Sequence, residues 1–252
     1  MAFTRPSLVD IFTRVRADFV SRLELSGTVL RRSVIFVHSA VMAGASHMLH
    51  GHLDYLGRQL FGDLSDDPYL VRQASLFSIV KTDPAFARAR LPFTGTNGTI
   101  APISSVLTRS DGAEYLTDAQ VTVVTLTAWA GLAVVAVDAL RQNGGKIYLC
   151  TTGGTTAASG GPTGTATAIT DGSAVWRHIA TGTAAVLAAV TAVVASADGT
   201  LEVGVALSFQ SPIAGIDSSA TVIESTQDGS DQEGTEGLRT RYIERLAEPP
   251  MG

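Results

Sequence analysis

The chain has 252 residues, of which 45% are hydrophobic and 16% are charged, and its formal net charge is −5. This length is sufficient for one large domain or for two to three small ones, each with its own core. The negative charge provides no electrostatic basis for binding nucleic acid or an anionic membrane, so neither is expected as a partner. The single cysteine, Cys150, excludes an internal disulfide.

Residues 1–19 carry charged side chains throughout and lack an uninterrupted apolar core, so they do not have the pattern of a signal peptide. The most apolar run, 184–197, is about 14 residues long, which is too short to span a bilayer. We therefore expect a soluble protein that is made in a cytoplasm.

The first eighty or so residues have helical periodicity. Ser7 is the expected N-cap of a first helix, and Gly27 is expected to break it. A second helix is predicted from Thr28 to about Phe61, and its length of roughly 50 Å exceeds the width of a small domain. Part of its apolar stripe is therefore expected to pack against another chain. The predicted helix-bundle interface consists of Leu30, Val34, Val37, Val41, Met48, Leu56 and Leu60.

A third helix is predicted at about Pro68–Val80, and from Ala85 the hydrophobic period changes to two. Asn97-Gly98 and Asp111-Gly112 are strong turn signals, so the stretch that contains them reads as two consecutive hairpins. The predicted strands are Arg88–Thr94, Val106–Arg109, Ala113–Leu116, Val121–Leu126, Lys146–Thr151, Ala174–Ile179, Val186–Val194 and Val203–Phe209.

The predicted fold class is α+β and multidomain, with a long-helix region, a discontinuous β-rich domain that carries a small β insertion, and a short C-terminal helix at Thr235–Ala247. Glu248-Pro249-Pro250 ends that helix, because proline cannot continue it. The expected boundaries are a helical region at 1–84, a β-domain at 85–130 and 184–226, a Gly/Thr-rich inserted β-module at 131–183, and an acidic linker with its helix at 227–252. A further C-terminal domain is expected to be missing or truncated after Gly252.

Three segments resemble ligand sites without meeting their requirements. His47 and His50 in HMLHGH have metal-compatible spacing, but a histidine on an apolar stripe is usually a packed one. GGTTAASGGPTG lacks the lysine of a phosphate loop and better suits hairpin tips. QDGSDQEGTEG does not match a calcium loop and favours a solvated linker. We therefore predict no catalytic residue, no metal and no cofactor.

Aromatic residues of the insert allow two interpretations. Tyr148 and Trp176 could form a ligand surface on which sugars stack, although aromatics more often fill the core of a small sheet. The first interpretation leads to an alternative function, which is receptor or glycan binding through the insert. A cell-wall hydrolase has only unpaired carboxylates in its favour, and no nucleophile elbow is present.

Several ordered blocks of the chain together resemble the baseplate J-like family of contractile phage tails, which includes the Mu-type and P2-type wedge proteins. The resemblance covers nearly the whole chain except the glycine-rich insert. The blocks are FTRPSL at 3–8, RVRAD at 14–18, LRRSV at 30–34, HLDYLGRQLF at 52–61, FTGTNGT, IAP and DGAEYLTD within 93–118, SPIAGI at 211–216, and EGLRTR at 236–241 leading to EPP at 248–250.

This resemblance implies a structural, non-enzymatic virion protein of the tail baseplate that is assembled in the host cytoplasm. Members of the family form a ring of wedges around the central hub, and they transmit the change that triggers sheath contraction. The implied partners are other baseplate wedge subunits, a second copy of this chain, the sheath-initiator and hub/spike proteins, and tail fibre proteins.

Overall fold

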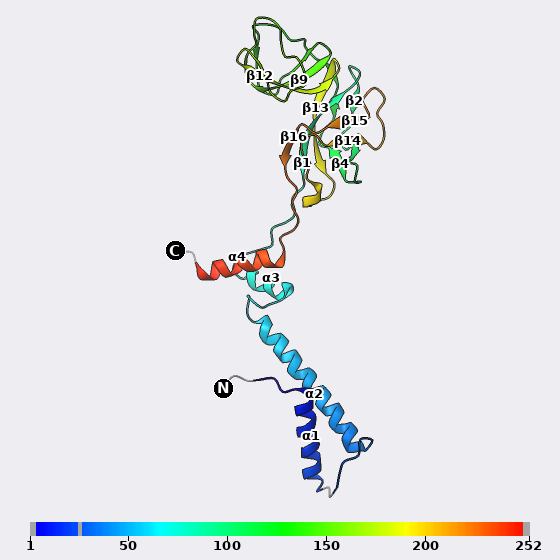
Figure 1. The fold of residues 1–252 in the computed structure, drawn as a ribbon, viewed down its shortest axis with the longest axis vertical. Helices are drawn as coiled ribbons and strands as arrows, with labels where there is room; N and C mark the ends of the chain where they lie inside the picture. The colour runs from blue at the N-terminus through cyan, green and yellow to red at the C-terminus, as the bar shows by residue number, and fades with distance from the viewer. Residues whose placement is uncertain (1–3, 25–26, 249–252) are drawn as a thin grey trace. The chain divides into compact units, whose positions relative to one another are not determined.

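The structure, a computed structural model, describes residues 4–24 and 27–248. The chain forms two compact units (Figure 1). The helical unit contains the chain up to Lys81 and again from Glu233 onward, and the β unit contains Thr82–Gln232. The α+β fold class is therefore as predicted. Among the described residues, no helix is both long enough and apolar enough to cross a membrane.

The helical unit begins with two packed helices, α1 (Leu8–Arg22) and α2 (Val34–Gln59). Ser7 caps α1 as predicted: its hydroxyl oxygen accepts a hydrogen bond from the Asp10 amide, and the Asp10 carboxylate accepts one from the Ser7 amide. This reciprocal pair satisfies two amide groups at the start of the helix. The expected break at Gly27 lies beyond the end of α1.

The predicted start of α2 at Thr28 is wrong. The amide of Ser33 donates to the Leu30 carbonyl in a turn, and the Ser33 hydroxyl then caps the helix by accepting from the Phe36 amide at 3.2 Å. Serine competes for backbone hydrogen bonds in this way, which makes it a helix start rather than a helix interior. With 26 residues, α2 is about 39 Å long instead of 50 Å.

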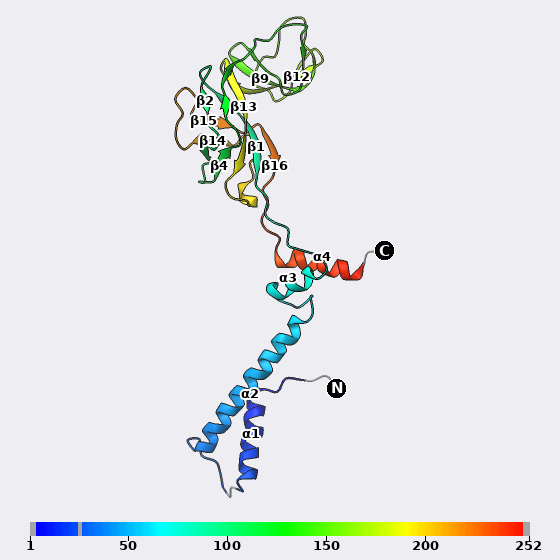
Figure 2. The same ribbon diagram turned by 180° about the vertical axis from the view of Figure 1, so that it is seen from behind.

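The helical unit also contains α3 (Asp67–Ser75) and α4 (Thr235–Ala247), which pack against each other (Figure 2). The bounds of α4 are those predicted, whereas α3 ends five residues before the predicted Val80. The backbone turns at Ser78, which has a φ of 60°, and helical geometry cannot continue through that conformation. The shared core of the two helices consists of Leu70, Ala74, Leu238 and Tyr242.

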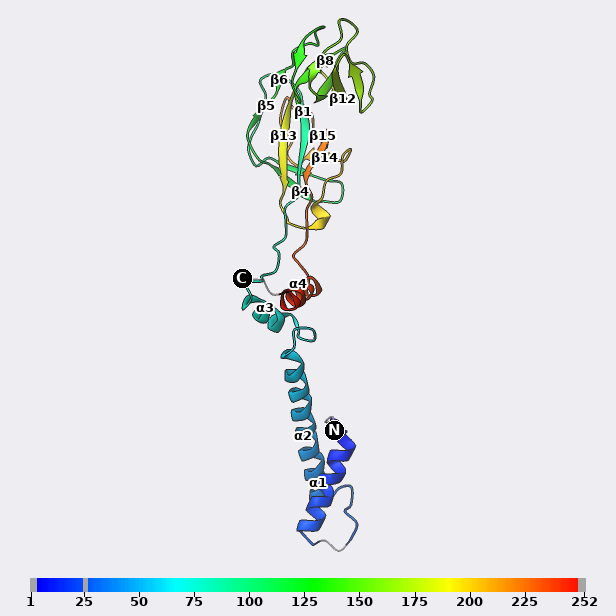
Figure 3. The ribbon, with the colours of Figure 1, turned by 90° about the vertical axis from the view of Figure 1, so that its left-hand side faces the viewer.

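The β unit is built on an eight-stranded sheet in which β1 (Arg88–Thr94) and β13 (Ala184–Ala192) are antiparallel neighbours (Figure 3). Its strand order is β15-β14-β3-β4-β13-β1-β16, and β6 also pairs with β13. Ala89, Leu91 and Phe93 of β1 are fully buried in the main core. The other strands are β3 (Val106–Thr108), β4 (Glu114–Thr117), β6 (Val124–Thr125), β14 (Ala206–Phe209), β15 (Ser219–Thr221) and β16 (Glu224–Gln227).

Of the two predicted hairpins, only the second forms. Asp111-Gly112 connects β3 to β4, which pair antiparallel. Asn97-Gly98 instead lies between β1, which pairs with β13 and β16, and β2 (Ile100–Ala101), which pairs with β5 (Val121–Thr122). The Asn97 side-chain oxygen accepts a hydrogen bond from the Thr125 amide. This turn is therefore held by a distant segment rather than by strands on either side of it.

The insert contains a four-stranded sheet in the order β11-β12-β9-β8, together with a separate pair of β10 and β7. Two of its strands, β9 (Lys146–Thr152) and β12 (Ala174–Thr181), match the predicted strands closely. The sequence analysis missed the short ones, which are β7 (Val134–Val135), β8 (Leu140–Asn143), β10 (Gly154–Thr155) and β11 (Ile169–Asp171).

The insert is packed against the main sheet of the β unit. Ile147 from the insert is fully buried with Leu126 and Ala185 from the main sheet. Arg177 donates a hydrogen bond to the Ile223 carbonyl at 2.6 Å. Removing the whole insert would therefore expose apolar residues of the main sheet, so single substitutions test the insert more cleanly than its deletion.

Candidate interaction surfaces

The side of α2 that does not contact α1 is apolar and exposed. The helix packs on α1 through residues such as Phe36, whose ring contacts Phe12 edge-on, and the buried Ala43. Around the rest of the helix, large side chains remain in solvent, with Val34 74%, Val41 65% and Met48 76% exposed. We call the exposed members the α2 face; they are Val34, Val37, Val41, Met42, Met48, Leu49, Leu53 and Leu56.

Between Val34 and Leu53 the α2 sequence contains no Asp, Glu, Lys or Arg. A helix with only one partner normally places charged residues on its solvent side. Toward its C-terminal end, the α2 face continues into an apolar groove of about 450 Å³ lined by Leu53, Leu56, Leu60 and Tyr69. An exposed apolar surface of this extent is typical of a protein interaction site.

The interface residues predicted from the sequence do not all lie on the helix. Val34, Val37, Val41, Met48 and Leu56 belong to the α2 face. Leu30 precedes the helix, in the turn that ends at Ser33, and Leu60 is the residue that follows the last turn. Three further members of the face, Met42, Leu49 and Leu53, were not predicted, although their three- and four-residue spacing was available in the sequence.

Three of the four histidines of α2 have described contacts. His47 lies 3.1 Å from the Arg5 guanidinium, and the His50 ring is 2.8 Å from the Ser46 carbonyl oxygen. The rings of His52 and Tyr55 are stacked. Within the described part of the chain, no group of three or more metal-ligating side chains is gathered.

The two aromatic residues that the sequence offers as a ligand surface of the insert are buried. Tyr148 is 1% exposed and Trp176 is 0% exposed. Both belong to the insert core, together with Val135 and Cys150. A sugar therefore cannot stack on either ring in this structure, which corrects the ligand-surface interpretation. The alternative function of receptor or glycan binding loses its structural basis at these two residues.

A buried carboxylate organises the insert core. Asp171, 5% exposed, accepts hydrogen bonds from the indole nitrogens of Trp129 at 2.7 Å and Trp176 at 3.1 Å. Its other oxygen accepts from the Ala157 amide at 3.0 Å. These bonds hold together segments that are separated by up to 42 residues. The sequence analysis did not identify this role, because the three donors converge only in the folded insert.

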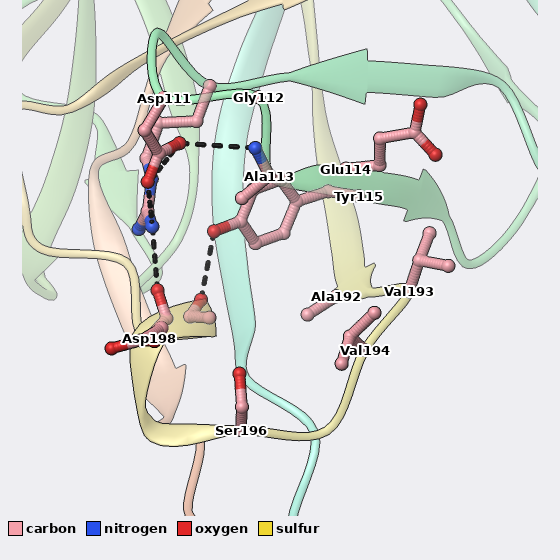
Figure 4. Close-up of a pocket in the computed structure, with 12 residues that line it drawn as sticks. Asp111, Gly112, Ala113, Glu114, Tyr115, Ala192, Val193, Val194, Ser196 and Asp198 are labelled. Carbon is pink, nitrogen blue, oxygen red and sulfur yellow. Dashed lines mark hydrogen bonds and ion pairs between the residues drawn. The ribbon is translucent and has the colours of Figure 1, made fainter.

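A second apolar surface is hollowed into the β unit, in a cavity of about 420 Å³ (Figure 4). We call it the hairpin cavity, because it lies beside the β3–β4 hairpin and the end of β13. Ala192, Val193 and Val194 contribute apolar lining, and Val194 is 67% exposed. The buried Tyr115 donates its hydroxyl proton to the Gly199 carbonyl at 2.9 Å.

Arg109 holds the wall of the hairpin cavity in place. Its guanidinium forms two hydrogen bonds to the Asp111 carboxylate, at 2.9 and 2.6 Å. It also donates to the backbone carbonyls of Thr200 and Asp198. The arginine therefore ties the hairpin to the short 3-10 helix at Ala197–Gly199. Because its guanidinium makes all four of these hydrogen bonds, Arg109 has a structural role in the hairpin.

The Asp111 carboxylate gives the hairpin a pH dependence. Its hydrogen bonds from Arg109 first and the Ala113 amide second lower its pKa from 3.8 to about 2. Because the folded pKa lies below the unfolded one, the stabilisation is complete above about pH 4 and is lost as the pH falls toward 2. We therefore expect the hydrogen-exchange protection factors of Gly112 and Ala113, which are corrected for the intrinsic pH dependence of exchange, to fall over this range in the wild type. In Asp111→Asn, this acid-dependent component should be absent; an unchanged profile would contradict the assignment.

The chain is similar in sequence to two curated proteins. No family model matches the chain. The Mu-like prophage FluMu protein gp47 of Haemophilus influenzae is 25% identical over 252 residues, which is 100% of this chain and 54% of that protein. Baseplate protein gp47 of Escherichia phage Mu is 24% identical over 115 residues, which is 46% of this chain and 32% of that protein. This chain thus spans about half the length, or less, of these curated relatives.

Among solved structures, a chain in the cryo-EM structure of the anti-feeding prophage baseplate, 6-fold symmetrised, is similar with a TM-score of 0.41 and 15% sequence identity. The match covers 93% of this chain and 52% of that one.

Proposed function

We propose that the chain is a structural subunit of a phage tail baseplate and that it works by binding other subunits rather than by catalysis. The observation that carries the proposal is the α2 face, which is too apolar and too exposed to be the solvent side of a finished helix. The names of the two curated relatives, a baseplate protein of phage Mu and a Mu-like prophage protein, support the same assignment.

In this proposal the subunit belongs to a wedge of the baseplate, in a ring around the central hub, within the tail of the virion. The α2 face packs against helices of other wedge subunits or of a second copy. Sheath-initiator, hub/spike and tail fibre proteins are the other neighbours, and assembly takes place in the host cytoplasm. Rearrangement of these contacts would transmit the change that triggers sheath contraction.

The energetics of the α2 face fit a role in assembly. Burying one exposed valine or leucine side chain contributes about 1.5–3 kcal/mol. Association costs roughly 4–15 kcal/mol in lost translational and rotational freedom, so several such side chains must be covered together. The eight members of the face can supply this stabilisation, whereas a few isolated apolar residues could not.

The test replaces two members of the face with charged residues. We expect Val37→Asp with Val41→Asp to abolish incorporation into tails, because two carboxylates would have to be buried in an apolar interface. The β unit should remain folded, as near-UV circular dichroism would show. Incorporation is measured by complementation of a phage that lacks the gene, followed by electron microscopy of its tails.

A matched control is available on α1. Thr13 and Ala17 are exposed and have the same four-residue spacing. Thr13→Asp with Ala17→Asp therefore adds the same charge to a helix in the same unit, and it should leave assembly intact. Normal tails formed with the α2 double variant would count decisively against the proposal.

A further inference from the structure

The turn that precedes α2 carries positive charge without a partner. Arg31 and Arg32 are both exposed, and no ion pair among the described residues involves either of them. They lie next to the N-terminus of α2, where the helix dipole is positive and anions are favoured. The first turn of α2 contains no acidic residue to compensate for them.

Apolar side chains flank these two arginines. Leu30 and Val34 are each 74% exposed, although neighbouring segments of α2 are packed on α1. The resulting feature, Leu30–Val34, we call the basic turn. It presents apolar and cationic groups together. The apolar groups are unfavourable in water, and the cationic groups are disfavoured by the positive helix end.

The hairpin cavity has the complementary properties. Val193 and Val194 provide apolar contact, and the exposed Glu114 and Asp198 provide negative charge. In Figure 4 these two carboxylates lie on opposite sides of the Tyr115 ring. The Arg109 guanidinium is ion-paired with Asp111 and interacts electrostatically with Asp198, so it compensates Asp198 in part. Among the described residues, the Glu114 carboxylate accepts one long hydrogen bond, of 3.4 Å, from Gln210.

We propose that the hairpin cavity binds the basic turn of a second copy of this chain. Leu30 would enter the cavity, and Arg31 and Arg32 would lie over its rim with their charged groups toward Glu114 and Asp198. Exposed ion pairs alone contribute little, so the apolar contact is an essential part of the site. A cavity of about 420 Å³ falls within the size range of binding pockets and can hold the leucine with an arginine stem.

This contact joins two different surfaces of the same chain. Two copies can therefore make it reciprocally and close into a two-fold dimer, or each copy can pass it on to the next and produce a ring or a filament. It differs from pairing through the α2 face and does not depend on the proposed baseplate role. Its electrostatic part should weaken as salt is added, because both surfaces are exposed.

Charge reversal tests the proposal with the full chain. One variant carries Arg31→Glu and Arg32→Glu, and the other carries Glu114→Lys and Asp198→Lys. The wild type should self-associate in sedimentation velocity at 50 mM NaCl, and each variant alone should do so at least about tenfold more weakly. An equimolar mixture of the two variants should recover association, because each then meets a surface of opposite charge.

Site-specific cross-linking provides a second measurement that does not require charge reversal. A chain with Arg32→Cys mixed with a chain with Glu114→Cys should form a mixed disulfide dimer, whereas neither should cross-link efficiently alone. Cys150 is buried and does not compete. The proposal is overturned if the wild type does not self-associate, if the Arg31/Arg32 variant associates as the wild type does, or if mixing restores neither association nor cross-linking.

Discussion

Replacement of Asp171 with alanine is expected to destabilise the insert by about 3–5 kcal/mol, because one buried and two partly buried donors would lose their only described acceptor at once. The indole group of Trp176, which is fully buried, cannot reach water without opening the insert core. No other side chain of the described insert core carries a carboxylate that could replace Asp171.

The two tryptophans make this prediction easy to measure, since they are the only ones in the chain and both donate to Asp171. Their fluorescence during guanidinium unfolding therefore reports on the surroundings of this carboxylate. Asp171→Asn should give a smaller loss, because the amide keeps one acceptor oxygen. Asp83→Ala, at an exposed site of the β unit, is the control and should shift the transition little. A loss below about 1 kcal/mol in Asp171→Ala would contradict this role for the carboxylate.

Arg239→Ala is expected to release α4 from the loop that follows α2, at a cost of about 2–4 kcal/mol. The Arg239 guanidinium donates to three backbone carbonyls of that loop, those of Gly62, Asp63 and Ser65. Ser65 is fully buried, so water cannot readily replace the lost donor at its carbonyl. Lysine cannot span the three carbonyls, and Arg239→Lys should recover only part of the stability.

Hydrogen exchange of the α4 amides measures this release directly. Arg245 lies near the end of the same helix and is exposed, so Arg245→Ala is the matched control and should change exchange very little. The close contact at Gly62 offers an independent check, because a Cβ atom at this position would lie 2.1 Å from the Tyr242 ring. Protection of α4 that stays at the wild-type level in Arg239→Ala would show that the core of Leu238 and Tyr242 suffices.

Helix caps and hydrophobic periodicity, which act between residues close in the sequence, were enough to predict several of the helices and strands. The Ser7 cap, the strand Arg88–Thr94 and the final helix Thr235–Ala247 were all identified with their observed start. The prediction for α2 began too early because its apolar stripe appeared to include Leu30, whereas the serine at position 33 decides where the helix starts. Strands of two or three residues, such as Val134–Val135, are too short to display a period.

The sites depended on contacts that the sequence does not reveal. The hairpin cavity combines residues 109–115 with residues 192–199, which meet only in the folded sheet. Tyr148 and Trp176 could equally have been surface or core residues, and their burial decided the question. The apolar repeat of α2 was visible in the sequence, but the side of the helix left open was defined only by the position of α1.

The packing of α4 on α3 sets an order of events during synthesis. Ala74 and Leu238 share a small core although about 160 residues separate them, and the entire β unit lies between them in the chain. At translation rates of about 5–20 residues per second, roughly 10–30 s pass before α4 leaves the ribosome. During that interval the apolar side of α3 has no cover from its own chain. The nascent helical unit therefore matures only after the β unit has been synthesised, and transient chaperone binding there would protect it from aggregation.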